Sequence, residues 1–262
     1  MTILDQLASY AKERTEAAKE KVRTAEIKEM AESMPPAGEA FAFEKALKGD
    51  GISFICECKK ASPSKGIIAP EFPYLQIAME YEAAGADCIS VLTEPKWFLG
   101  RDEYLKEIAG SVRIPCLRKD FTVDEYMIYE AKLLGASAVL LICSILTPEQ
   151  IKAYMGVCDR LGMSALVETH DENEVKVALD SGARMIGVNN RNLKDFTVDT
   201  ENSRRLRSMI PHDVLFVSES GVSCAEDVKI LSDIGADAVL VGETLMRAEN
   251  KKERLCELKS LL

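Results

Sequence analysis

The sequence predicts an α/β protein, a (β/α)8 TIM barrel with an N-terminal helical extension. A helical segment closes with Gly-Ala and leads into a strand four times, at Gly85, Gly135, Gly182 and Gly235. Glycine is the residue that most readily ends a helix in the left-handed conformation. Four further apolar strand candidates precede or lie between these repeats. Alternating strands and helices form a parallel sheet, and eight such units in roughly 210 residues match a closed barrel.

The strand candidates are short apolar runs rich in β-branched residues. They comprise residues 52–58, 114–117, 164–167 and 214–217 and the runs that follow the four Gly-Ala pairs. Amphipathic helices are predicted after the strands, for example over residues 123–134, 148–161 and 225–234. A doubly wound open sheet is the alternative fold. The segment after the first strand, ECKKASPSKG, lacks the G-x-G-x-x-G turn typical of that fold.

The first fifty residues precede the first strand and are predicted to be helical. Apolar residues recur there with helical spacing at Ile3, Leu4, Leu7, Tyr10 and Ala11. A run rich in Lys, Glu and Ala continues to Met34, where Pro35 and Pro36 end the helix. A further short helix is predicted over residues 41–47. We expect residues 1–50 to pack as an extension on a barrel of residues 51–262, within one domain, with the charged run forming a solvated face.

The composition restricts the class of protein. The net charge of −10 argues against a nucleic-acid partner. No apolar run approaches the ~18 residues of a membrane span, and the N-terminus is too charged for a signal peptide, so we expect a cytoplasmic protein. The eight cysteines lie mostly in apolar runs and are expected to be buried free thiols. Cys56 and Cys58 form a single C-x-C without a second pair, so no metal site is predicted.

Charged and polar residues follow the apolar runs, where a TIM barrel has its active site. Glu57 and Lys59 share one face of the first strand because strand side chains alternate. Burying charge costs several kcal/mol unless the charge is paired or used, and a plain salt bridge is the alternative explanation. The other strand ends carry Thr93, Glu94, Arg118, Lys119, Asp120, Glu168, Asn189, Asn190, Arg191, Ser218, Glu219, Ser220 and Glu243. Lysines and glutamates at one mouth suit general acid–base catalysis.

Glycines follow the last two strands, at Gly221 and Gly242. Barrels commonly bind phosphate there, through backbone N–H groups and the N-terminus of a short helix, although two tight turns would also need glycine.

His170 is interpreted as part of the loop into the next helix, with Asp171 as its N-cap. Trp97 either stacks on a substrate or packs within its loop.

Seven ordered motifs resemble indole-3-glycerol phosphate synthases across essentially the whole chain: ECKKASPSKG, LTEPKWFLG, LRKDF, ALVETHDE, IGVNNRNL, SESGV and VGETLM. The resemblance implies a stand-alone carboxy-lyase of tryptophan biosynthesis. Such an enzyme closes the indole ring of 1-(2-carboxyphenylamino)-1-deoxyribulose 5-phosphate and releases CO2 and water. It implies a small phosphorylated substrate, no metal or organic cofactor, and, as an expectation, a monomer. Leu99 stands where many relatives carry a smaller or polar residue.

The resemblance also implies site residues. Lys119 would be the general acid on the substrate carbonyl, and Glu168 the acid or base of the later dehydration. Lys59 would engage anionic groups of the substrate beside its carboxylate neighbour Glu57. Asn189, Glu219 and Ser220 would hold hydroxyls, with Arg191 and Leu193 bordering the substrate. The remaining positions match the phosphate surroundings (Ser62, Gly221, Gly242, Glu243, with Lys59) and the wall of the anthranilate pocket (Pro63, Phe98, Phe121).

Three alternatives remain open. Another phosphate-binding barrel, such as an isomerase of phosphoribosyl-aminated substrates, is expected to place a Cys or Asp base on the first strand, where Glu57 and Lys59 stand. A Schiff-base aldolase would use Lys119 or Lys59 covalently. A non-catalytic barrel acting as a scaffold would not need acid–base residues at four strand ends.

Overall fold

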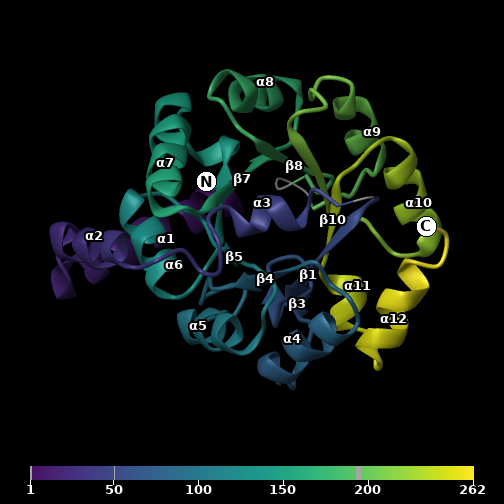
Figure 1. Ribbon diagram of the computed structural model, residues 1–262, viewed down its shortest axis with the longest axis horizontal. Helices are drawn as coiled ribbons and strands as arrows, with labels where there is room; N and C mark the ends of the chain where they lie inside the picture. The colour runs from purple at the N-terminus through teal and green to yellow at the C-terminus, as the bar shows by residue number, and fades with distance from the viewer. Residues whose placement is uncertain (1, 50, 193–195) are drawn as a thin grey trace.

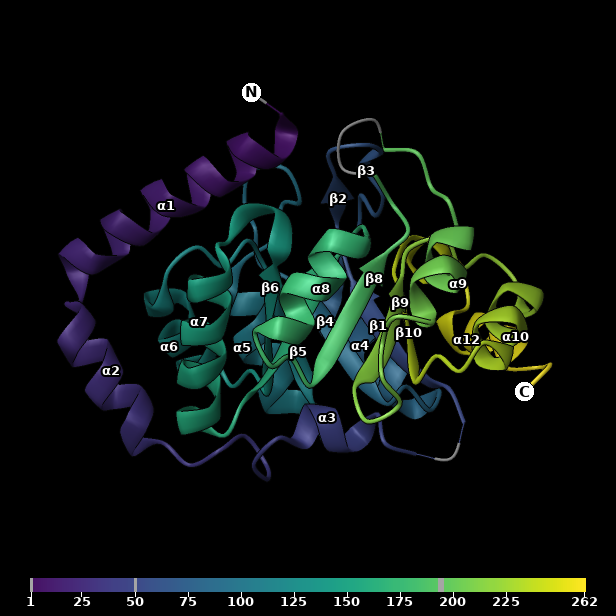
Figure 2. The same ribbon diagram turned by 90° about the horizontal axis from the view of Figure 1, so that it is seen from above.

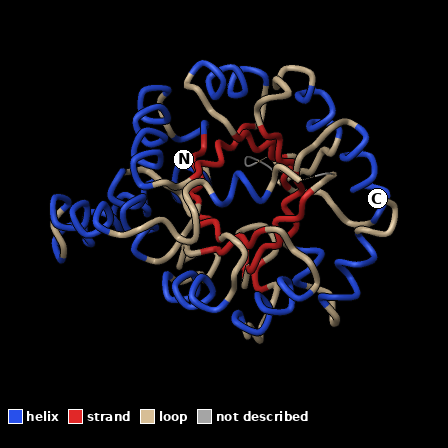
Figure 3. Tube along the Cα trace, viewed as in Figure 1, coloured by secondary structure: helices blue, strands red, loops and turns tan. Residues whose placement is uncertain are grey.

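Eight parallel strands close into a barrel (Figure 1, Figure 3) in the computed structural model, which describes residues 2–49, 51–192 and 196–262. Each strand pairs with its neighbours in chain order, and β1 pairs with β10 to complete the ring. The barrel strands are β1 (Ser53–Cys58), β4 (Cys88–Leu92), β5 (Cys116–Lys119), β6 (Ala138–Ile142), β7 (Ser164–Thr169), β8 (Met185–Asn189), β9 (Leu215–Glu219) and β10 (Ala238–Val241). The predicted (β/α)8 fold is confirmed.

Helices surround the barrel on its outside (Figure 3). They are α4 (Tyr74–Ala83), α5 (Asp102–Ser111), α6 (Glu125–Leu133), α7 (Pro148–Leu161), α8 (Glu172–Asp180), α9 (Glu201–Arg207), α10 (Ala225–Asp233), α11 (Glu243–Met246) and α12 (Lys251–Leu258), with a 3-10 turn η1 (Cys143–Ile145). The predicted helix over 148–161 matches α7 at both ends because Thr147 caps it and Gly162 ends it. The four repeated glycines have φ between 79° and 88°, as expected of residues that end helices.

The apolar core has two layers. One fills the barrel and contains an inward-facing residue from nearly every strand, such as Ile55, Leu117, Leu166 and Val217. The other lies between strands and helices and contains their sequence neighbours, for example Phe54. This division follows from the alternation of side chains along a strand. Five of the eight cysteines are buried in these layers, and all eight thiols are free.

The N-terminal segment forms three helices that run from one mouth of the barrel to the other (Figure 2). They are α1 (Ile3–Lys21), α2 (Thr24–Ser33) and α3 (Ala42–Ala46). Helix α1 lies near the mouth that carries the small hairpin of β2 (Ala61–Ser62) and β3 (Gly66–Ile67), α2 packs on α6, and α3 lies at the opposite end. The expected boundary with the barrel falls at Asp50, which is outside the described residues.

The expectation of one helix continuing to Met34 was wrong. The helix breaks at Val22 and Arg23, whose backbones are extended. The apolar faces of the two parts belong to different layers, with Leu7 and Ala11 in the barrel layer and the α2 side chains in the outer layer. A straight helix does not reach both surfaces. Among the described residues, no helix combines the length and apolar character needed to cross a membrane.

Candidate active site

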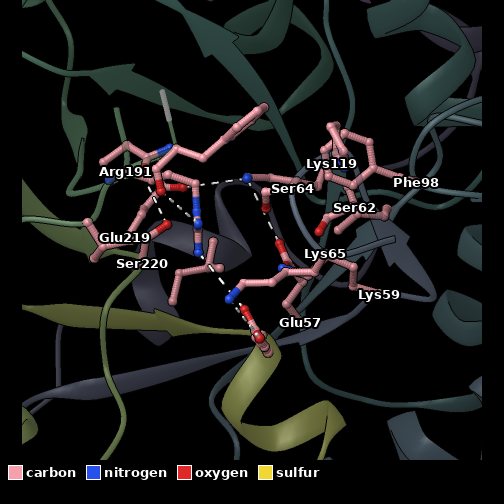
Figure 4. A pocket seen from close by; sticks show the side chains of 18 of the residues that line it. Glu57, Lys59, Ser62, Ser64, Lys65, Phe98, Lys119, Arg191, Glu219 and Ser220 are labelled. Atoms are coloured by element: carbon pink, nitrogen blue, oxygen red, sulfur yellow. Dashed lines mark hydrogen bonds and ion pairs between the residues drawn. The ribbon is translucent and has the colours of Figure 1, made fainter. Parts of the chain in front are cut away.

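A cavity of about 690 Å3 opens at the mouth formed by the carboxyl ends of the strands (Figure 4). Every predicted site residue that the structure describes lines it; Leu193 lies outside the described residues. The lining residues among those predicted are Glu57, Lys59, Ser62, Pro63, Phe98, Lys119, Phe121, Glu168, Asn189, Arg191, Glu219, Ser220, Gly221, Gly242 and Glu243. The structure therefore brings together residues that are up to 186 positions apart, from Glu57 to Glu243.

Strand alternation explains how four ionisable side chains reach this cavity. Lys119 and Glu219 end β5 and β9, and Glu57 and Glu168 are the penultimate residues of β1 and β7. Each follows by two positions an apolar residue of the barrel interior: Ile55, Leu117, Leu166 and Val217. The apolar residue fills the barrel, and the next inward-facing position on the same strand carries the charge. The barrel thus supplies an apolar floor beneath the site.

Lys119 lies among three carboxylates. Its Nζ is 3.9 Å from Glu57 Oε2, 3.9 Å from Glu168 Oε2 and 3.5 Å from Glu219 Oε2. Burial opposes the charged form of Lys119, but the three carboxylates outweigh it and raise the pKa of this lysine above its usual value. Lys119 is therefore a protonated ammonium at neutral pH, held by charge in the centre of the mouth.

Lys59 neutralises Glu57. The Lys59 ammonium donates to Glu57 Oε1 at 2.5 Å, and Ser90 Oγ donates to Glu57 Oε2 at 3.5 Å. Burial works against the ionised form of Glu57, but Lys59 and Lys119 together hold its pKa below the usual value. Glu57 is thus a fixed anion in contact with two lysines.

Glu219 is in the opposite situation. It is 1% exposed, and neither carboxyl oxygen completes a hydrogen bond with a described residue. Burial, reinforced by the charge of Glu168, raises the pKa of Glu219 to about 8. Burial and the charge of Glu168 thus favour the protonated form of Glu219, while the Lys119 ammonium opposes it.

Two glycines make room for these carboxylates. A Cβ on Gly187 of β8 would overlap Glu219 Oε1. A Cβ on Gly242 would overlap Glu57 Oε1 and lie 2.9 Å from Lys59 Nζ. Gly242 therefore serves the Glu57–Lys59 pair as well as the turn into α11. The prediction of a short helix beginning after Gly242 is confirmed by α11.

The end of β8 forms a polar edge of the cavity. Asn189 Oδ1 accepts from Ser220 Oγ at 2.9 Å and from the Arg191 backbone N–H at 3.0 Å. Ser220 and Gly221 both have positive φ, at 68° and 97°. This turn directs the chain after β9 around the cavity and fixes the position of the Ser220 hydroxyl.

Cations gather at the side of the cavity formed after β10. Glu243 lies 3.0 Å from Arg247 Nε, 3.8 Å from Lys65 Nζ and 4.0 Å from Arg191 Nη2. Burial opposes ionisation, but Arg247 and Lys65 hold the pKa of Glu243 below its usual value. Three cations around one carboxylate leave a surplus of positive charge, which suits a phosphate. Lys65 and Arg247 were not predicted as phosphate neighbours, since neither follows a strand directly.

An apolar wall faces this polar side. Phe98 and Phe121 lie with ring centroids 6.1 Å apart. The α1 side chains Ile3, Leu4 and Leu7 also line the cavity, which the sequence did not indicate. Their helical spacing showed an apolar face without showing which surface it covers.

The loop that carries Phe98 is shaped by a buried carboxylate. Glu94, fully buried, accepts from the backbone N–H groups of Lys96, Trp97 and Phe98 at 2.8 to 2.9 Å. Leu99 has a positive φ of 52° in the same loop. Trp97 packs edge-on against Tyr10 of α1 and does not line the cavity, so packing is its role in this structure.

His170 stands next to the site. Its Nε2 lies 3.4 Å from Glu168 Oε1. Asp171 caps α8 as predicted. The interpretation of His170 as only a loop residue missed this contact, because His170 lies beyond the end of β7, where alternation no longer fixes the side of a residue. Among the described residues, no group of three or more His, Cys, Asp or Glu side chains is placed to hold a metal ion.

Known proteins resemble this chain in sequence and in fold. A model of the indole-3-glycerol phosphate synthase family matches residues 4–258. The indole-3-glycerol phosphate synthases of Ruminiclostridium cellulolyticum and Lacticaseibacillus casei are 54% and 49% identical over 257 residues, 98% of each chain. The solved 3-hexulose-6-phosphate synthase of Salmonella typhimurium is 14% identical and has a TM-score of 0.67 over 80% of this chain and 98% of its own, which reflects the fold alone. The chain therefore belongs to the indole-3-glycerol phosphate synthase family, whose members are carboxy-lyases.

Proposed function

We propose that this protein converts 1-(2-carboxyphenylamino)-1-deoxyribulose 5-phosphate into indole-3-glycerol phosphate, with Lys119 as general acid and Glu168 as the second acid–base group. The observation that carries the proposal is the position of the Lys119 ammonium among Glu57, Glu168 and Glu219 in the cavity. Family membership supplies the substrate and the overall reaction.

Ring closure requires a proton donor. The aromatic carbon that bears the carboxylate attacks the ribulose carbonyl carbon, and the π electrons of the carbonyl move onto oxygen. Lys119, protonated at neutral pH, gives this oxygen its proton. The surrounding carboxylates hold the ammonium in place, which limits the reorganisation needed when the proton moves.

Loss of CO2 then returns the C–C bonding electrons to the ring and restores its aromaticity. The final dehydration removes the new hydroxyl as water: one proton goes to the departing oxygen and another leaves the neighbouring carbon. Glu168 is assigned to this step because it matches the acid–base glutamate of the family and lies 3.9 Å from the Lys119 ammonium, whereas Glu57 is already paired with Lys59. Lys59, bonded to Glu57, is the second available ammonium and also contacts anionic groups of the substrate.

The cavity has complementary ends for the substrate. The phosphate would lie near Ser62, Gly221 and Gly242, where Lys65, Arg191 and Arg247 gather around Glu243. The carboxyphenyl ring would lie against the apolar wall of Pro63, Phe98 and Phe121. Asn189, Ser220 and Glu219 would hydrogen-bond the hydroxyls between these ends.

The test is indole fluorescence after addition of the substrate. Wild type should give the signal, Lys119→Ala should lose at least ~100-fold in kcat, and the exposed control Lys152→Ala should match wild type. Activity that survives in Lys119→Ala would move the acid to Lys59. A folded wild-type protein without signal would refute the proposed reaction.

A further inference from the structure

A chain of polar contacts leads away from the cavity behind Glu168. The Nδ1 atom of His170 lies 3.0 Å from Glu174 Oε2, and the His170 backbone N–H donates to the same oxygen at 2.8 Å. Ser144 Oγ donates to Glu174 Oε1 at 2.5 Å and lies 3.3 Å from His170 Nδ1. Asn202 Nδ2 donates to the His170 carbonyl at 3.1 Å. The imidazole is therefore held from η1 and α8, and the His170 backbone from α8 and α9.

The other ring nitrogen faces the site. His170 Nε2 is buried, completes no hydrogen bond with a described residue, and lies 3.4 Å from Glu168 Oε1. The second oxygen of Glu168 lies 3.9 Å from Lys119 Nζ. Glu168 thus stands between His170 and Lys119, with one carboxylate oxygen toward each. Contacts of catalytic groups are often long in a free enzyme and shorten when the substrate binds.

The charges around His170 favour its protonated form. The ionisable groups that face it are Glu168 from β7, Glu174 from α8 and Glu219 from β9, and its other polar neighbours, Ser144 and Asn202, are uncharged. Burial opposes the imidazolium, but the bond to Glu174 and the charge of Glu168 outweigh it and raise the pKa of His170.

We propose that His170 is a positioning residue for Glu168. Held by Glu174, it offers an Nε2–H to Glu168 Oε1 and so orients the other oxygen toward Lys119 and the substrate. The inference rests on the proposed function, since it assigns His170 to the dehydration performed by Glu168. His170 itself touches no reacting atom; it acts through the carboxylate.

The contact can be tested without the reaction. The chain has two histidines, His170 and His212, so a His212→Asn variant assigns their NMR signals. Glu168→Gln and Glu174→Gln should each lower the pKa of His170 by at least about half a unit, because each substitution removes a negative charge that faces the imidazole. Glu172→Gln, an exposed position on α8, should leave it unchanged. An unchanged His170 titration in Glu168→Gln would overturn the proposal.

Activity then separates positioning from plain packing. The amide nitrogen of Gln reaches the place of His Nε2, whereas that of Asn resembles Nδ1. His170→Gln should keep kcat within ~3-fold of wild type and His170→Asn should lose ~10-fold, both with little change in KM. The wild-type kcat profile should have an alkaline limb at the pH where NMR shows His170 to titrate, and His170→Gln should lack it.

The outcomes distinguish the two proposals. Positioning is refuted if both variants lose activity equally and in proportion to their melting temperatures. It is also refuted if the limb at the pH where NMR shows His170 to titrate persists in His170→Gln; a separate limb near pH 8 would belong to Glu219 and would not count. A wild-type protein that forms no product would refute the proposed function, while the NMR titration would still decide whether His170 and Glu168 are in contact.

Discussion

Glu219 links the chemistry of the site to the stability of the protein. Its pKa of about 8 in the folded state exceeds the ordinary glutamate value because of burial and the neighbouring Glu168. Between pH 4.5 and 8 the folded protein therefore holds a proton that the unfolded chain has released. Stability should fall as pH rises through this window, by at most about 1.4 kcal/mol per pH unit, and level off above it.

Comparison with Glu219→Gln isolates this contribution. Gln has a similar shape and does not titrate, so the free energy of unfolding of the variant relative to wild type should increase from pH 5 to pH 8. Urea unfolding at four pH values measures the difference. Glu172→Gln, an exposed substitution, should show no such trend. If the difference in the free energy of unfolding between Glu219→Gln and wild type did not change with pH, Glu219 would be ionised in the folded protein.

Gly242 provides a second test at the scale of one residue. Gly242→Ala would place a methyl group against Glu57 Oε1 and Lys59 Nζ. Relief of the overlap requires the pair to move, so we expect kcat/KM to fall at least ~10-fold and stability to fall by about 1–3 kcal/mol. Gly110→Ala on α5, where nothing lies within 4 Å, should be neutral or slightly stabilising. Wild-type kinetics in Gly242→Ala would show that the pair tolerates displacement.

The difference between predicted and unpredicted site residues has a physical cause. Glu57, Lys119, Glu168 and Glu219 were predictable because alternation along a strand fixes the side on which a residue lies. His170 follows Glu168 by two positions but lies beyond the strand, where alternation no longer holds. Its contact with Glu168 depends on hydrogen bonds to Glu174, which no local pattern shows.

Helix α1 is the element that ties the extension to the active site. Arg14 makes two bonds to Asp120, at 2.7 and 3.2 Å, and Lys19 contacts Asp124 at 2.8 Å. Asp120 directly follows Lys119 and its side chain is fully buried. The expectation that the charged run of α1 is only a solvated face was therefore incomplete, because these two cations bind the end of β5 and the start of α6.

Arg14→Met should loosen this connection. Asp120 would keep its bonds from Thr93 and the Phe121 backbone N–H but lose its bidentate partner, so we expect stability to fall by about 3 kcal/mol. KM should rise several-fold, because Ile3, Leu4 and Leu7 line the cavity. Lys12→Met, exposed on the same helix, is the control. A loss of stability without any change in KM would separate α1 from substrate binding.

Elements were predicted best where their signals are local. Helix α7 was predicted at both ends because its capping residues are adjacent to it in sequence. The break between α1 and α2 was not predicted, since it arises from the two surfaces that their apolar faces cover. The position of α3 at the far end of the barrel likewise depends on tertiary contacts, such as the ion pair of Glu44 with Arg184.

The whole molecule has a net negative charge but gathers cations in its site. The net charge is −10, yet Lys59, Lys65, Lys119, Arg191 and Arg247 all line one cavity. Such local concentration attracts an anionic substrate to the mouth against the overall charge. The eight-stranded closure was predictable from the repeat spacing, whereas the size and the lining of the cavity depend on packing between elements distant in sequence.

The extension and the barrel should unfold together. Trp97, the sole tryptophan, lies in the loop after β4 with its ring 5.7 Å from that of Tyr10 in α1, so its fluorescence reports the contact of the extension with the barrel mouth. Far-UV circular dichroism reports the helices of the whole chain. Because α1 and α3 both contribute side chains to the apolar layer inside the barrel, we expect the two signals to give coincident urea transitions. Fluorescence that changes at lower urea than the dichroism, in wild type as well as in Lys12→Met, would mean that α1 detaches from a barrel that remains folded. If the earlier fluorescence change occurs only in Arg14→Met, the Arg14–Asp120 pair is instead the contact that makes unfolding cooperative.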